Sequence, residues 1–257
     1  MGEIIVSALI NKRVVSALDI IVSRRNTTEL LRLKQQYRTD TTSDNVVVIR
    51  SADIVILSVK PQNLPEVMKG IKGHFKPEQL LLSIVAGAKI DALRSGSGHQ
   101  RIVRAMPNIP ARIGEGISVW TSSHEVTERQ KEWSRRILGA LGKEIYVDDE
   151  KYMDKATAIS GSGPAYFFLL TEALINAARD IGLSQEMAKD LVVQTIIGSG
   201  NLLQQSGRSS TELYKMVATA GGATATALDR FEHGNFKDLI QSAIAAAYDK
   251  AVELGNE

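Results

Sequence analysis

Two adjacent glycines, Gly221–Gly222, lie between two predicted helices and are followed directly by Ala223 and Thr224. Small residues at the start of a helix leave backbone N–H groups open at its positive end, which suits a carboxylate. The hydroxyl of Thr224 can both donate and accept a hydrogen bond. The pattern predicts a binding site for a small carboxylic acid. The alternative is an ordinary turn between helices that Thr224 caps.

A second run of small residues, Ser160–Gly163, precedes Pro164–Ala165–Tyr166. Proline is well placed just inside a helix start, because its missing N–H would have no intrahelical partner there. The small residues ahead of it leave backbone donors accessible to a ligand. This segment is therefore a second candidate for ligand binding.

Three turns follow three apolar runs in the first half of the chain: Val59–Gln62, Ala86–Gly87 and Met106–Asn108. If the runs are strands of one parallel sheet, the turns meet at its carboxyl edge, where open α/β folds bind ligands. Each turn alone is weak evidence, because any such loop uses Gly or Pro. Three turns on one edge predict a cleft.

Basic residues close an earlier apolar run, Asp19–Ser23, which is followed by Arg24 and Arg25. In a dinucleotide site an acidic residue at this place binds the ribose 2′-hydroxyl, whereas a basic one suits the 2′-phosphate of NADP. The sequence therefore favours NADPH, with NADH as the alternative. A solvated helix start is the interpretation without a ligand.

The elements that must position these residues differ between the two halves of the chain. Up to about Val147, short apolar runs alternate with helical patterns such as Thr27–Tyr37, Leu64–Ile71 and Thr127–Leu141, which predicts a doubly wound α/β layer. The predicted strands are continuous apolar runs typical of a parallel sheet buried on both faces. They are Asp19–Ser23, Ile54–Val59, Leu80–Val85, Arg101–Arg104, Gly116–Val119 and Ile145–Val147.

After Asp154 the pattern predicts helices alone, with N-caps at Ser184 and Ser210. The run Tyr166–Leu170 is apolar around the whole circumference of its helix and must be buried on all sides. One small helical domain has little room for that, so we expect an intertwined homodimer. A monomeric bundle is the alternative. The five predicted helices are Pro164–Ile181, Ser184–Gln205, Thr211–Ala218, Ala223–His233 and Phe236–Gly255.

Composition excludes several classes of function. The 257 residues are 44% hydrophobic and 23% charged, with a net charge of +2, which is too balanced for a nucleic-acid-binding surface. Without cysteine there is no disulfide, thiol nucleophile or thiolate metal site, and the four histidines are isolated, so no metal site is expected. The apolar runs fall short of a membrane span and no signal peptide is visible, which predicts a cytoplasmic protein.

Taken in order, the segments SVKPQ, SIVAGA, VRAMPN, GEG, SGSGPAY and AGGAT resemble the pyrroline-5-carboxylate reductase family over essentially the whole chain. The resemblance implies a Rossmann-like NAD(P)-binding domain, residues 1–150, and an all-α domain for substrate binding and dimerisation, residues 151–257. It implies NADPH-dependent reduction of the cyclic imine to L-proline, at an active site formed between the domains across a homodimer. In the family such dimers often join into a larger ring, here a pentamer of dimers.

The resemblance also implies roles for individual residues. For the substrate these are Glu150, Gly221, Gly222, Ala223 and Thr224, with Thr224 catalytic through a hydrogen bond to the ring nitrogen. For the cofactor they are Ser23, Arg24, Asn45, Ser58, Val59, Lys60, Pro61, Ala86, Met106, Pro107 and Asn108. Ala220 stands where the family usually has proline, which costs the turn some rigidity.

One departure from the family is large, because Met1–Gly2 matches only the end of the usual strand and G-x-G-x-M-G/A loop. That first strand is central in a doubly wound sheet. We expect Met1 to be an internal methionine of a longer reading frame; the alternative is a genuine variant whose sheet is closed differently. Two other functions stay open: an impaired or inert dimeric paralogue, and a related imine or β-hydroxyacid reductase.

Overall fold

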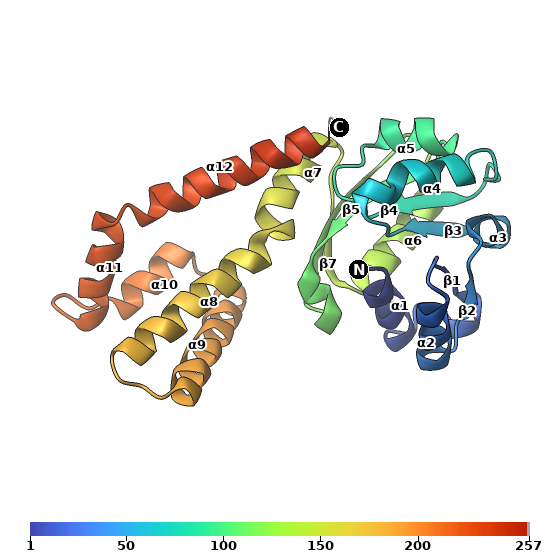
Figure 1. Cartoon of the computed structure of the whole chain (residues 1–257). Helices are drawn as coiled ribbons and strands as arrows, with labels where there is room; N and C mark the ends of the chain where they lie inside the picture. Colours follow the sequence, from blue (N-terminus) through green and yellow to red (C-terminus); the bar gives the residue numbers. More distant parts are fainter. Residues whose placement is uncertain (256–257) are drawn as a thin grey trace. The chain divides into compact units, whose positions relative to one another are not determined.

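The computed structural model describes residues 1–255, which form two compact units (Figure 1). Unit 1 comprises Met1–Pro164 together with the end of the chain from Ala247. Unit 2 comprises Ala165–Ala246. The predicted domains, residues 1–150 and 151–257, stay a prediction.

Unit 1 contains two sheets. The strands β1 (Ile21–Ser23) and β2 (Asp40–Thr42) form a parallel pair. Within residues 1–255 no ladder joins β1 to β3. The second sheet has the order β3-β4-β5-β6-β7, with strands Ile54–Leu57, Leu80–Ser83, Ile102–Pro107, Gly116–Ser122 and Gly142–Tyr146.

The larger sheet is mixed, which corrects the expectation of a purely parallel one. β3, β4 and β5 are parallel, but β6 runs antiparallel to β5, and β7 is parallel to β6. The chain between β5 and β6 holds only the short 3-10 helix Ile109–Ile113. A parallel return needs a crossover of a dozen or more residues, so this connection turns the strand back.

Helices cover both faces of the sheet, and Figure 1 shows α4 and α5 together on one of them. Leu80 and Leu82 pack with apolar residues of α1 and α6, whereas Leu81 packs with those of α3, α4 and α5. Neighbouring side chains of a strand point to opposite faces. Because both faces are covered, all three leucines are fully buried. The helices are α1 (Gly2–Asn11), α2 (Thr27–Tyr37), α3 (Asn45–Ser51), α4 (Leu64–Ile71), α5 (Ile90–Ser97), α6 (Glu128–Gly139) and α7 (Lys151–Ala156).

The predicted helices of the second half are present: α8 (Gly163–Asp180), α9 (Gln185–Ser206), α10 (Ser210–Val217), α11 (Ala223–His233) and α12 (Phe236–Leu254). Ser184 caps α9 as predicted. The predicted cap at Ser210 is wrong by one residue. Ser209 caps α10 and forms a capping box with Glu212 at the third helical position.

Unit 2 has almost no core of its own. Among its described residues Ala188 alone is a buried hydrophobic, while Phe167, Phe168 and Leu169 are each more than 60% exposed. Isolated domains of this size need a substantial buried core. The predicted need for a partner surface is therefore visible in the structure.

By length and composition alone, one helical stretch could cross a membrane: Lys151–Asp180, with a mean hydropathy of 1.2. The expectation that every apolar run falls short of a span is wrong for this stretch. A single such helix is weak evidence for a membrane protein, because a helix buried against a partner has the same composition. The predicted cytoplasmic location stays a prediction.

His99 forms a buried polar contact at the edge of the core. It is 4% exposed, its ring stacks on Phe75 and its Nε2 lies 2.7 Å from the carbonyl oxygen of Gln79. Burial lowers the pKa of His99, and the hydrogen bond to Gln79 opposes that shift only in part. The folded protein therefore holds this imidazole in its neutral form.

We expect this burial to make the folded state less stable in mild acid. Below the ordinary histidine pKa of about 6.5, the unfolded chain binds a proton that the folded chain excludes. Stability is therefore retained above that pH and lost as the pH falls toward the lowered folded pKa. The free energy of unfolding, measured with urea at several pH values between about 7 and 5, should fall less steeply with falling pH in His99→Gln than in the exposed control His124→Gln. An equal pH dependence of stability in the two variants would contradict the burial of a neutral imidazole at His99.

Candidate active site

A cavity of about 1470 Å³ lies in unit 1 between β1 and β3, bordered by the start of α1. It is large for a small-molecule site, whose usual range is about 300–1,000 Å³, because it includes the space between the two sheets. Six of the predicted cofactor residues line it: Ser23, Arg24, Asn45, Ser58, Val59 and Lys60. The structure thus brings together residues that are far apart in the sequence.

Two close contacts join residues that line this cavity. The Ser23 hydroxyl donates to Oδ1 of Asn45 at 2.7 Å, which joins β1 to the start of α3. Gly2 lies so close to Ser58 that a Cβ on Gly2 would clash with the Ser58 hydroxyl. The first turn of α1 therefore lies against the residue that follows β3, and a side chain at position 2 would require the Ser58 side chain to move.

The start of α1 can receive an anion. Met1 is its N-cap residue and makes no side-chain capping bond, and the first intrahelical bond is from the Ile5 N–H to the Met1 carbonyl oxygen. The N–H groups before Ile5 have no intrahelical partner, and the helix end carries a partial positive charge. These donors, with Ser58 and Arg24 on the same cavity, fit the phosphates of a dinucleotide.

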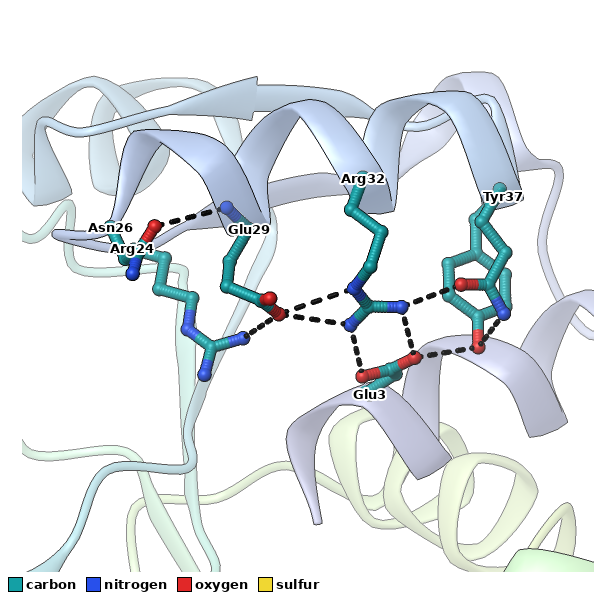
Figure 2. A network of polar contacts seen from close by, with 7 residues as sticks. Glu3, Arg24, Asn26, Glu29, Arg32 and Tyr37 are labelled. Atoms are coloured by element: carbon teal, nitrogen blue, oxygen red, sulfur yellow. Dashed lines mark hydrogen bonds and ion pairs between the residues drawn. The ribbon is translucent and has the colours of Figure 1, made fainter.

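Figure 2 shows a chain of alternating charges beside this cavity. Nη1 of Arg24 lies 3.2 Å from Oε2 of Glu29, and Nη2 of Arg32 lies 3.1 Å from the same oxygen. Arg32 also forms a bidentate pair with Glu3 of α1, at 3.0 and 2.7 Å. The Tyr37 hydroxyl donates to the same Glu3 carboxylate at 3.1 Å.

These contacts shift the pKa values of the network in consistent directions. The hydrogen bonds from Arg32 lower the pKa of the Glu3 carboxyl, and those same bonds raise the pKa of Arg32. Partial burial and the bond to Glu3 raise the pKa of Tyr37. Glu3 is therefore an anion at neutral pH, and Arg32 is its counter-ion.

Sequence reasoning missed this network. Glu29 and Arg32 are three residues apart on the predicted helix Thr27–Tyr37, so their pairing could have been found from spacing. Asn26, which caps this helix by accepting from the Glu29 N–H, also follows a known pattern. The pair between Arg32 and Glu3 joins two helices and had no local signature.

The other predicted cofactor residues do not line this cavity. Pro61 begins the 3-10 helix Pro61–Asn63, and Ala86 lies in the turn after β4. Met106 and Pro107 end β5 and Asn108 follows it; Pro107 and Asn108 are buried. The side chain of Asn108 donates to the Ser160 carbonyl oxygen at 3.1 Å, so it holds the Ser160–Gly163 segment against the end of β5.

That segment begins within a π-helix, Thr157–Gly161, and ends at Gly163, where α8 begins. A Cβ on Gly161 would lie 2.8 Å from Cε of Met106, so a larger residue here would require the end of the Met106 side chain to move. Single turns of π-helix inside longer helices are frequent at functional sites. The small residues here serve close packing, beside the ligand role predicted for them.

Glu150 belongs to a buried ionic cluster. Nη1 of Arg104 on β5 lies 2.8 Å from Oε1 of Glu150, and its Nη2 lies 3.1 Å from Oδ1 of Asp154. The same Glu150 oxygen accepts from the Ile90 N–H at the start of α5. The Arg104 side chain is 4% exposed. The predicted substrate contact by Glu150 stays a prediction, but the residue has a structural role.

The glycine turn of unit 2 is open at the start of α11. Gly221 has a φ of +71°, and a Cβ on Gly222 would lie 2.6 Å from Oγ1 of Thr219, so both positions favour glycine. Gly222 is the N-cap residue of α11, which has no side-chain capping bond. The alternative in which Thr224 caps the helix is therefore wrong.

Comparisons with known proteins agree with these features. A family model described as pyrroline-5-carboxylate reductase dimerisation matches residues 150–254, and one described as NADP oxidoreductase coenzyme F420-dependent matches residues 1–87. A pyrroline-5-carboxylate reductase of Pseudomonas aeruginosa is 35% identical over 95% of this chain and 89% of its own length. The chain belongs to the pyrroline-5-carboxylate reductase family.

Solved structures of the family have the same fold. The enzyme of Coxiella burnetii is 33% identical, with a TM-score of 0.88 over 98% of this chain and 94% of its own. The Plasmodium falciparum enzyme, solved with NADP bound, is 32% identical, with a TM-score of 0.90 over 99% of this chain and 94% of its own. The Rossmann-like domain followed by a helical dimerisation domain is thus confirmed.

We expect the Arg104 cluster to be essential for stability. Arg104→Met leaves Glu150 and Asp154 without their cation, and breaking a buried pair from one side costs about 3–5 kcal/mol. Urea unfolding measures the loss. Arg135→Met, which removes an exposed pair with Glu132, is the control and should cost below about 1 kcal/mol. A similar small effect for both variants would contradict the structural role of Arg104.

Proposed function

We propose that this chain reduces pyrroline-5-carboxylate to L-proline with NADPH, and that the turn Gly221–Thr224 binds the substrate. The observation that carries the substrate assignment is the start of α11. Within the described chain, the N–H groups of Ala223, Thr224 and Ala225 donate to no backbone carbonyl oxygen, and the Thr224 hydroxyl has no hydrogen-bond partner. A carboxylate and a ring nitrogen supply the partners that these groups lack.

In this proposal the substrate carboxylate accepts from the N–H groups at the positive end of α11. The Thr224 hydroxyl then orients the ring nitrogen by a hydrogen bond. A protonated imine already carries the proton that the product amine keeps, so no strong side-chain acid is required. When bound, NADPH supplies the hydride that reduces the imine carbon, while the protein contributes position and charge.

The cofactor residues support NADPH over NADH. Arg24, which is half-exposed, lines the cavity at the end of β1 and can pair with a 2′-phosphate. Ser23 and Asn45 lie beside it. We place the phosphates at the start of α1, near Ser58.

The chain acts as a homodimer in this proposal, joined through the apolar side chains that unit 2 exposes, with a pentamer of dimers as the further assembly. The match of residues 150–254 to a dimerisation domain supports it. So does the scarcity of buried hydrophobic residues in the described part of unit 2. An obligate partner surface of this kind is strongly apolar.

We expect Thr224→Ala to lower kcat/KM for pyrroline-5-carboxylate at least about tenfold, equivalent to ~1.4 kcal/mol of transition-state stabilisation. Thr224→Ser keeps the hydroxyl and should retain most of the activity. Steady-state oxidation of NADPH measures both variants.

The matched control is Thr226→Ala, on the same helix turn, where the hydroxyl bonds only the Gly222 carbonyl oxygen. It should leave kcat/KM near the wild-type value. Light scattering should give each protein the mass of at least two chains. Near-normal kinetics for Thr224→Ala would refute its catalytic role, and a monomeric active wild type would refute the assembly.

A further inference from the structure

The charged network beside the cofactor cavity has its two ends in the cavity and its centre outside. Arg24 and Glu3 line the cavity, whereas Glu29 and Arg32, which connect them, are absent from its lining. The order along the network is Arg24, Glu29, Arg32, Glu3, so cations and anions alternate (Figure 2). A phosphate entering the cavity meets one attractive and one repulsive end.

Glu3 is the repulsive end. It stands in the first turn of α1, the helix whose open N–H groups face the cavity. A carboxylate there competes with a phosphate for the same positive helix end. The bidentate pair with Arg32 compensates this charge, and the Tyr37 hydroxyl adds a third donor.

Glu29 is a second competitor, because its carboxylate pairs with the guanidinium that would hold the 2′-phosphate. One oxygen, Oε2, accepts from Arg24 and from both Nε and Nη2 of Arg32. Arg32 therefore takes part of the charge of Glu29 and leaves Arg24 with a single shared bond. Without Arg32, Glu29 would be free to pair with Arg24 alone.

We infer that Arg32 is a positioning residue for NADPH: it neutralises Glu3 and Glu29, so that the helix end and Arg24 can bind the cofactor phosphates. The inference rests on the proposed placement of the cofactor. With Arg32 the four side chains sum to zero charge, and without it they sum to minus one. Neutralising each glutamate favours a different phosphate: neutralising Glu3 favours the pyrophosphate at the start of α1, and neutralising Glu29 favours the 2′-phosphate beside Arg24.

The test is direct binding of NADPH and NADH to the full-length protein, followed by nucleotide fluorescence or calorimetry. Arg32→Gln should raise the Kd of NADPH about fivefold or more, as expected for one uncompensated charge near a phosphate in a partly solvated site. The Kd of NADH should rise less, since NADH has no 2′-phosphate. The difference from wild type should shrink in about 1 M salt, where the screening length is about 3 Å.

Two double variants separate the contributions. Glu3→Gln added to Arg32→Gln should restore the part of the loss that NADH and NADPH share. Glu29→Gln added to Arg32→Gln should restore part of the preference for NADPH. Arg135→Gln is the matched control, because Arg135 has a similar exposure and a similar pair three residues apart, but its partner Glu132 does not line the cavity, whereas Glu3, a partner of Arg32, does.

Unchanged Kd values for Arg32→Gln would overturn the inference. So would a loss that neither double variant restores, accompanied by a lower melting temperature, because that result describes a purely structural residue. Failure of the wild-type protein to bind NADPH would instead refute the proposed function. In steady-state kinetics Arg32→Gln should raise the KM for NADPH and leave kcat within about twofold of wild type.

Discussion

The buried guanidinium of Arg104 ties together elements of unit 1 that lie far apart in the sequence. It reaches from β5 to two carboxylates: that of Glu150, directly before α7, and that of Asp154, within α7. Glu150 in turn accepts from the start of α5. A buried charge must be paired, so this constraint fixes where the chain leaves the sheet and enters the helices. The π-helix and the Ser160–Gly163 segment follow directly from that point.

A similar demand for compensated charge shapes the cofactor side. The site must attract phosphates, yet it contains Glu3 in the first turn of α1. The sheet beside it is divided between β1 and β3, so α1 and α2 are held together partly by the pair between Glu3 and Arg32. The same pair that joins these helices also removes a repulsive charge from the cavity. Stability and affinity for the cofactor are linked here through one arginine.

Much of the fold followed from local sequence patterns. The bounds of α2, α4 and α11 were predicted to the residue; Asn26 caps α2, whereas α4 has a proline at its start and α11 follows a glycine turn. β2 was missed because Asp40–Thr42 is short and polar, and the reversal at β6 depends on loop length more than on strand composition. The grouping of Ser23, Asn45 and Ser58 at one cavity followed from the resemblance to the family, which assigns all three residues to the cofactor.

The long-range ion pairs could not be predicted from one sequence. Glu150 was predicted only as a substrate residue, and the folded chain alone brings Arg104 to it. Glu3 and Arg32 are likewise paired across two helices. Charged residues carry no periodic signature of a distant partner, whereas apolar and turn-forming residues report their local environment.

The central claim is that this chain transfers hydride from NADPH to a cyclic imine. The most direct measurement uses NADPH deuterated at both C4 positions, with pyrroline-5-carboxylate and the full-length protein, followed by mass spectrometry of the product. The account predicts proline that carries one deuterium, on the ring carbon that was the imine carbon. Consumption of neither reactant, or proline without the label, would contradict it.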